Sequence, residues 1–210
     1  MNISTAPSKL PCRSTCSITL LVIAFALGAA IEAFATTVPA PGFPQMVARA
    51  EHIFTATVSS VQPAWAVRAG QRCIVTTVEF NVEQMHKGAA AKDLRLEFLG
   101  GTVGEDTMEV QGVPKFRAGE RVILFSENNG RQFCPLVGIH HGKLVIERDA
   151  RSGSDVVLRH DRQPISSASD IGADGTPPLV AAGQATIQQP LRVEAFLDAL
   201  NRELHKGARP

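Results

Sequence analysis

Apolar and polar side chains alternate along three segments of this chain, and this period of two constrains its fold more than any other feature. Residues 54–59, 77–83 and 94–98 each place an apolar side chain at every second position. Successive side chains of a β-strand point to opposite faces, so the pattern predicts strands with one buried and one polar face. The chain is therefore expected to be mainly β.

Several shorter segments also have the composition of strands. They are predicted at residues 107–111, 122–125, 133–139, 143–147 and 156–158. The run 122–125 is apolar throughout, which is typical of a central strand covered on both faces. Residues 63–70 are expected to form a turn, and His140, His141 and Gly142 to join a hairpin. Seven or eight short strands with tight turns indicate a barrel or a sandwich.

Helical patterns flank the β region. Residues 45–51 predict a short helix, and residues 190–206 carry one apolar stripe that predicts an amphipathic C-terminal helix. The stretch 161–189 is rich in small and polar residues without periodicity, so it is expected to be a flexible linker. The β-barrel domain would then span residues 36–160.

The first 35 residues have the three parts of a secretory signal peptide. Lys9 and Arg13 provide positive charge, a 14-residue apolar run follows at 18–31, and small residues precede the expected cut between Ala35 and Thr36. A membrane anchor is the alternative, but the run is shorter than the roughly 20 residues that a spanning helix needs. The mature protein is expected to be periplasmic or extracellular, without a stable membrane span.

The charge balance of the mature chain argues against two kinds of partner. After removal of residues 1–35 it retains 19 basic and 19 acidic side chains. A formally neutral chain has no electrostatic reason to bind nucleic acid or an anionic membrane surface. No nucleic-acid partner is therefore expected.

Two cysteines remain after cleavage, Cys73 and Cys134. In an oxidising compartment two cysteines most simply pair, so a disulfide between them is predicted. Closing a loop of that length would stabilise the fold by roughly 4 kcal/mol. A reactive thiol is the alternative interpretation, and no neighbouring residue in the sequence supports it.

The search for catalytic signatures finds no assembled motif. The chain lacks a nucleophile elbow, a Walker loop, a dinucleotide-binding glycine motif and a zinc-protease helix motif. His140 and His141 are the most suggestive pair, but a metal would need a third ligand from His52, His86 or a distant carboxylate. Polar turn residues are the preferred interpretation, so no catalytic residue, metal ligand or cofactor is predicted.

The most organised stretch is 112–125, which reads GVPKFRAGERVILF. Together with the segments around Trp65, Lys87-Gly88 and Gly100-Gly101, it resembles a family of exported bacterial proteins that share the motif G-x-P-x-F-x-x-G-E-x-V-x-x-F. The resemblance covers roughly residues 45–148 and implies a shared fold without an assigned activity.

More remotely, the order of these motifs resembles the netrin-like barrel of the tissue inhibitors of metalloproteinases. That resemblance implies an OB-like small barrel with a short N-terminal helix. Those inhibitors reach the zinc of their target with an N-terminal cysteine, whereas this mature chain begins at Thr36.

These observations favour an exported, non-enzymatic β-barrel protein that binds another exported protein, such as a protease or an envelope component. One alternative is a metal-assisted hydrolase that uses His140 and His141 with a remote acid. Another is a structural envelope protein whose terminal helix mediates assembly.

Overall fold

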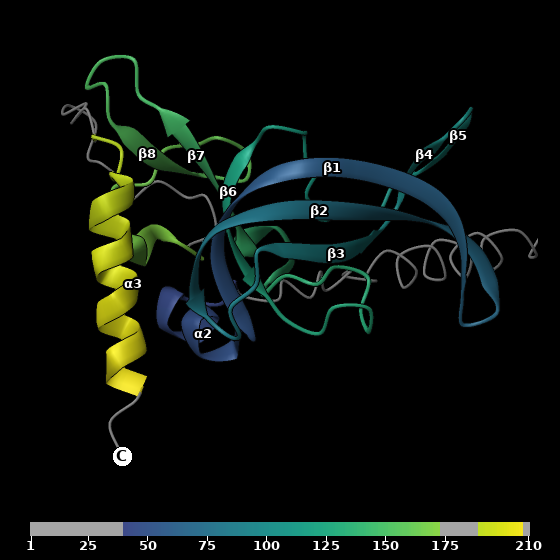
Figure 1. The fold of residues 1–210 in the computed structure, drawn as a ribbon, viewed down its shortest axis with the longest axis horizontal. Helices are drawn as coiled ribbons and strands as arrows, with labels where there is room; N and C mark the ends of the chain where they lie inside the picture. The colour runs from purple at the N-terminus through teal and green to yellow at the C-terminus, as the bar shows by residue number, and fades with distance from the viewer. Residues whose placement is uncertain (1–39, 173–188, 208–210) are drawn as a thin grey trace, which may run out of the picture. The chain divides into compact units, whose positions relative to one another are not determined.

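The computed structural model describes residues 40–172 and 189–207, and Figure 1 shows their arrangement. This part of the chain is mainly β, as the alternation predicts. The predicted signal peptide with its cleavage site, and most of the predicted linker, lie outside the described residues. No helix in the described ranges has the length and hydropathy needed to span a bilayer.

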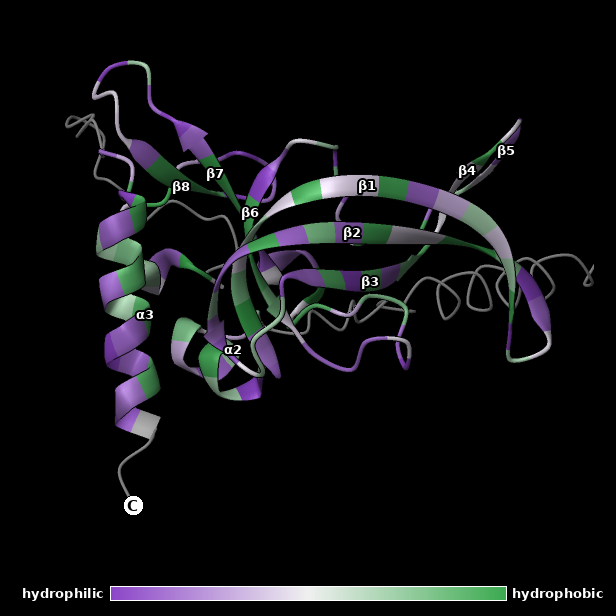
Figure 2. Cartoon of the chain, viewed as in Figure 1, coloured by the Kyte–Doolittle hydropathy of each residue, from purple (hydrophilic) through white to green (hydrophobic). Residues whose placement is uncertain are grey.

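Six strands form one antiparallel sheet in the order β3-β2-β1-β6-β7-β8, and two short strands form a separate hairpin. The strands of the large sheet are β1 (His52–Arg68), β2 (Gln71–Lys87), β3 (Asp93–Leu99), β6 (Arg121–Ser126), β7 (Lys143–Arg148) and β8 (Asp155–Arg159). The small hairpin consists of β4 (Gly101–Val103) and β5 (Asp106–Met108). All three alternating segments predicted from the sequence lie in strands β1 to β3, and Figure 2 shows the alternation along β3.

Strands β1 and β2 are longer than predicted, with 17 residues each, and form a bent arm (Figure 1) that β3 joins along Val75 to Asn81 of β2. The prediction of a turn at 63–70 is wrong for most of that range, because pairing continues to Arg68 and Gln71. Only Ala69 and Gly70 form the turn, both with positive φ. Pro63 is tolerated because β6 pairs with β1 only as far as Thr57, so an edge is left where a missing N–H costs nothing.

The prediction of a strand at 133–139 and a hairpin across 140–142 is also wrong. Ile139–Gly142 forms a 3₁₀ helix (η1), after which β7 begins at Lys143. Gly138 and Ile139 both have positive φ, a conformation that no strand maintains. Residues 143–147 and 156–158 are confirmed as strands, and of 107–111 only the first two residues belong to a strand.

The large sheet has two ends, β3 and β8, so closure into a barrel is not seen among the described residues. Other parts of the chain cover both edges. The Leu99 N–H on β3 donates to the Phe133 carbonyl at 2.8 Å, and the Val157 N–H on β8 donates to the Leu191 carbonyl at 2.8 Å. The OB-like barrel predicted from the resemblance is therefore not confirmed, and an open sheet with covered edges is observed.

Two separate hydrophobic clusters lie on the two faces of the sheet. Ile53 and Ile123 belong to the first cluster, whereas their neighbours Phe54 and Leu124 belong to the second. This split shows that β6 is covered on both faces, as the apolar run 122–125 predicts.

Helices α2 (Phe43–Arg49) and α3 (Val193–Gly207) cover the first cluster. They lie within a few residues of the predicted helices 45–51 and 190–206. The rings of Phe43 and Phe196 meet edge to face with centroids 5.9 Å apart, and Phe196 and Leu200 are fully buried. The C-terminal helix thus docks on its own domain.

Replacing Phe196 by Ala should lower the free energy of unfolding by about 3–5 kcal/mol, because a large buried ring would leave a cavity. Urea denaturation followed by circular dichroism would measure the change. Asp198→Ala, on the exposed side of the same helix, should change stability by less than about 0.5 kcal/mol. Similar, small effects for both variants would contradict the docking of α3.

Candidate functional site

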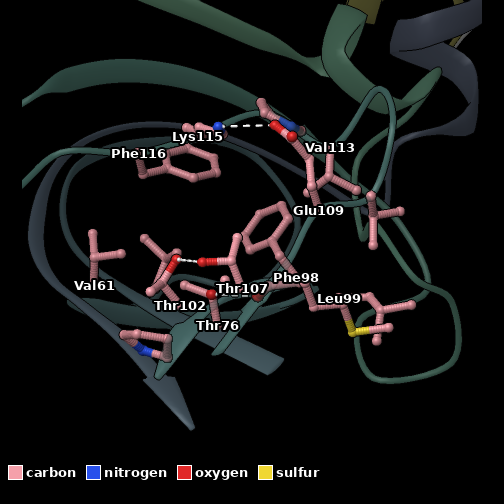
Figure 3. A pocket seen from close by; sticks show the side chains of 17 residues that line it. Val61, Thr76, Phe98, Leu99, Thr102, Thr107, Glu109, Val113, Lys115 and Phe116 are labelled. Atoms are coloured by element: carbon pink, nitrogen blue, oxygen red, sulfur yellow. Dashed lines mark hydrogen bonds and ion pairs between the residues drawn. The ribbon is translucent and has the colours of Figure 1, made fainter. Parts of the chain in front are cut away.

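A cavity of about 360 Å³ lies against the β1–β2 arm, between β3, the β4–β5 hairpin and the segment 109–116 (Figure 3). Its walls are mostly apolar, with a few hydroxyl groups and one ion pair. The lining residues include Val61, Thr76, Phe98, Thr102, Thr107 and Phe116.

Strand register determines which residues of the arm face this cavity. Val61 pairs with Val78, and Pro63 pairs with Thr76, so these four side chains share one face of the hairpin. The chain leaves β3 through Gly100 and Gly101, both with positive φ. A side chain at Gly101 would collide with the Thr76 hydroxyl and come within 3.0 Å of Pro63 Cβ, so only glycine lets β4 approach the arm here.

Two phenylalanine rings from distant parts of the chain turn toward the cavity (Figure 3). Phe98 comes from β3 and Phe116 from the motif at 112–125, and their ring centroids are 4.9 Å apart. Phe116 also meets Phe80 at 5.5 Å, edge to face. Phe116 of the motif at 112–125 therefore forms one wall of the site.

The polar groups of the cavity are already engaged with one another. The Thr76 hydroxyl donates to the Gly100 carbonyl at 2.6 Å, and the hydroxyls of Thr102 and Thr107 lie 3.0 Å apart. Lys115 and Glu109 form an exposed ion pair at 3.1 Å on the rim. Among the described lining residues there is no histidine, cysteine or serine. The mostly apolar lining, with its few polar groups already paired, is typical of a binding pocket.

The apolar face of the arm continues beyond the cavity. Alternation along β1 places Trp65 and Val67 on the same face as Val61 and Pro63. Both are exposed, Trp65 by 39% and Val67 by 72%. The Arg72 guanidinium lies 4.0 Å from the centroid of the Trp65 ring and stacks on it. The cavity and these two side chains lie on one face of β1, and we call them together the arm face.

A buried ion pair supports the cavity from behind. The Lys143 ammonium donates to Glu120 Oε2 at 2.9 Å and to the Lys115 carbonyl at 2.6 Å, and it lies 4.3 Å from the centroid of the Phe116 ring. Both side chains are almost completely buried. Burial lowers the pKa of Lys143, while Glu120 opposes that shift. The pair fixes the segment that carries Phe116.

Sequence reasoning missed this pair. Glu120 belongs to the shared motif and Lys143 follows Gly142 in the matched region, but no local pattern links residues so far apart. The sequence offers one signal of it: Lys143 is a charged residue directly before the apolar residues 144–146, and charged residues are rarely buried unless they are paired.

The two histidines singled out by the sequence lie on η1, away from the arm face. The rings of His140 and His141 have centroids 4.1 Å apart, and His160 approaches His140 at 4.3 Å. The expected third partners lie elsewhere, since His86 on β2 contacts the Thr55 hydroxyl at 2.8 Å. Within residues 40–172 and 189–207 no group of histidine, cysteine and acidic side chains is arranged to hold a metal ion.

Cys73 and Cys134 are both buried and carry free thiols in the structure, so the predicted disulfide is not formed there. Burial raises the pKa of Cys134 to about 12. A thiol with that pKa is protonated at neutral pH and is a poor nucleophile. The alternative of a reactive thiol therefore gains no support at Cys134.

Comparison of the chain with models of protein families, with curated proteins and with solved structures finds no match. The function is therefore argued from the geometry of the site.

Replacing Glu120 by Gln should lower the free energy of unfolding by about 3–5 kcal/mol, because it leaves the Lys143 ammonium buried without its counter-charge. Adding Lys143→Met should recover much of that loss. The matched control Glu109→Gln breaks the exposed pair with Lys115 and should cost less than about 1 kcal/mol. Chemical denaturation of the four proteins measures these differences, and equal costs for the two glutamates would contradict the role of the buried pair.

Stability should decrease as the pH falls below about 6.5, the ordinary pKa of histidine. Burial lowers the pKa of both His86 and His160 in the folded protein. In mild acid the unfolded chain therefore takes up protons that the folded chain does not, and unfolding is favoured until the lower folded pKa is passed. Denaturation between about pH 7.5 and 5.5, above the range of ordinary carboxylates, measures this dependence.

In that series His86→Asn and His160→Asn should each flatten the pH dependence. His205→Asn, at an exposed position on α3, should leave it unchanged. A wild-type protein that is equally stable across this range would show that the two half-buried histidines are protonated without cost.

Proposed function

We propose that this chain is an exported, non-enzymatic binding protein whose arm face receives a large apolar side chain from another exported protein. One observation carries the proposal. A cavity of about 360 Å³, lined by Val61, Phe98 and Phe116, lies on the same face of β1 as the exposed Trp65 and Val67. Binding energy at protein interfaces concentrates where an anchor side chain fills such a pocket and neighbouring apolar groups exclude water.

The size and chemistry of the cavity favour a side chain presented by a protein segment. Its volume is near the lower end of the roughly 300–1,000 Å³ range of small-molecule sites. The Thr102–Thr107 and Lys115–Glu109 contacts leave no charged group inside that would orient a polar ligand. An apolar anchor within an uncharged loop or extended segment matches this lining, and we propose a protease or an envelope component as the partner.

Strand addition at the two ends of the large sheet is a poor explanation for partner binding. The N–H groups of Leu99 on β3 and Val157 on β8 already donate to carbonyls of the same chain, so a partner gains little by pairing there. The edge of β1 beyond Thr57 is not paired with β6, and a segment that paired there would also bring its side chains to the arm face. We therefore propose that side chains on the arm face supply the specificity.

Two other candidate functions have less support. A metal-assisted hydrolase at His140 and His141 needs converging ligands, and their rings stack instead on one another. Assembly of an envelope structure through α3 needs a free apolar stripe, whereas Phe196 and Leu200 are buried within their own domain.

The proposal includes export, because the sequence supports a cleaved signal peptide ending at Ala35. It also keeps the predicted OB-like barrel as the fold that the open sheet resembles. In support, β1 pairs with both β2 and β6, and the loop that carries Phe133 bonds to the β3 edge, where a barrel would close.

Trp65 provides a direct test, since it is the sole tryptophan and the chain has no tyrosine. Peptides selected from a displayed library should change the Trp65 emission on titration, because they would cover its ring. Val113→Phe, which fills the cavity, should weaken the selected peptides by at least about tenfold, or about 1.4 kcal/mol.

The matched control is Gln62→Ala, an exposed change on the other face of β1, which should leave the affinity unchanged. Peptides that bind Val113→Phe as tightly as the wild type would place the interface elsewhere. If small apolar molecules compete with the fluorescence change and no peptide does so, the partner is a small ligand and the protein-binding proposal is wrong.

A further inference from the structure

A second, smaller pocket of about 250 Å³ lies between η1, β7 and the end of β8. Nitrogen-bearing side chains dominate its walls, in contrast to the apolar cavity of the arm face. Its ionisable lining residues are His140, His141, Lys143, Arg159, His160 and Asp161.

Three imidazoles from two separate segments meet at this pocket. The positive φ of Gly138 and Ile139 turns the chain so that His140 and His141 enter the same wall. His160 follows β8 directly, and its ring lies 4.3 Å from the ring of His140, which is stacked between the other two. Residues 20 positions apart in sequence thus supply one concentrated set of ring nitrogens.

Arg159 is the source of positive charge beside the rings. The Lys143 ammonium pairs with Glu120 at 2.9 Å and also donates to the Lys115 carbonyl, so it adds little net charge. The Arg159 guanidinium donates to the Asp170 carbonyl at 3.0 Å from within the same wall. Asp161 is the one acid among the described lining residues, and its Oδ1 already accepts the Gln163 N–H at 3.0 Å. This environment attracts an anion and repels a cation.

We propose that this pocket binds an oxyanion, a carboxylate, sulfate or phosphate group, through the imidazole N–H groups of His140, His141 and His160. Arg159 supplies the attracting charge. The proposal does not depend on the arm face, because the groups that would bind the anion line a different pocket and suit a different ligand chemistry.

Proton uptake should accompany binding. In the empty pocket burial lowers the pKa of His160, and the charges of His140, Lys143 and Arg159 lower it further, while Asp161 raises it. Beyond the pocket wall, Arg162 pairs with Glu147 at 3.3 Å and so adds little net charge. A bound anion would offset the cost of protonating the rings, so the oxyanion and the proton should bind cooperatively.

A metal ion fits the same residues less well. The ring centroids are 4.1 and 4.3 Å apart with planes tilted by 41° and 44°, so the rings overlap along a stack. Ligands of a tetrahedral zinc site converge on one point about 2 Å from each nitrogen. Zinc binding is therefore an outcome that the test must distinguish.

The test is a titration of the full mature chain with sodium sulfate, followed by NMR of ¹⁵N-labelled imidazoles. Sulfate keeps its charge across mild acid, so any pH dependence belongs to the protein. Of the six histidines, His140, His141 and His160 should shift in a saturable way, and His205 on α3 should not. If one proton is taken up on binding, the affinity for sulfate should rise by about tenfold for each unit by which the pH is lowered, as long as the pH stays above the pKa of the imidazole that takes up the proton.

Acetate and inorganic phosphate, titrated in parallel, identify which oxyanion the pocket prefers. His140→Asn and His160→Asn should each weaken binding of the preferred anion by about tenfold, as expected when a charge-assisted hydrogen bond is lost. His205→Asn should bind the anion like the wild type.

Weak shifts of all the histidines alike, or an affinity that does not change with pH, would overturn the proposal. Stoichiometric zinc binding that shifts the same three rings would replace it with a metal site. None of these outcomes changes the result expected from the Trp65 titration with peptides, so failure of the anion-binding proposal is distinguishable from failure of the protein-binding proposal.

Discussion

Strand β1 pairs with two neighbours along its first third and with one neighbour beyond it, and the rest of the structure depends on this change. From His52 to Thr57 it lies between β2 and β6, so the sheet has two covered faces and two hydrophobic clusters. After Thr57 β1 pairs only with β2, which pairs in turn with β3 from Val75 to Asn81, and these strands extend as a bent arm. Helices α2 and α3 pack on the first cluster, which includes no residue of β1 beyond Ile53, so within the described residues the apolar face of the arm is either covered by strands and loops or exposed.

Segment 109–116 and the β4–β5 hairpin cover part of that face, and the cavity is the volume that they leave unfilled. The Lys143–Glu120 ion pair lies behind its inner wall. Lys143 hydrogen-bonds to Glu120 and to the Lys115 carbonyl, directly before Phe116, whose ring is 4.9 Å from that of Phe98. A buried ion pair often contributes less to stability than an apolar pair of the same shape, but it fixes the position of the segment that forms this wall.

The alternation of side chains predicted the strands that carry the arm face, because burial on one side of a strand is a local property of the sequence. It did not predict how far β1 and β2 extend, since Pro63 and Gly70 signal a turn whether or not the intervening residues pair. Whether Val61 and Pro63 pair depends on their partners in β2, Val78 and Thr76, which lie further along the chain and outside any local pattern. For the same reason His160 was not foreseen as the neighbour of His140. The distance between them is fixed by the antiparallel β7–β8 pairing and by the turn at Gly138.

The two candidate sites have opposite chemistry but share a wall. Lys143 lines the histidine pocket, and its ammonium contacts Lys115 and Phe116 of the arm face. Gly112 begins the same segment, and a side chain there would come within 3.8 Å of His140 Nδ1. Any ligand that displaces residues 112–116 therefore changes the surroundings of both sites. If a bound oxyanion changed the affinity of the arm face for its partner protein, then by linkage the bound partner would change the affinity of the histidine pocket for the oxyanion by the same factor. The motif at 112–125 thus has a physical reason for its organisation: it forms the wall that separates an apolar cavity from a cationic one.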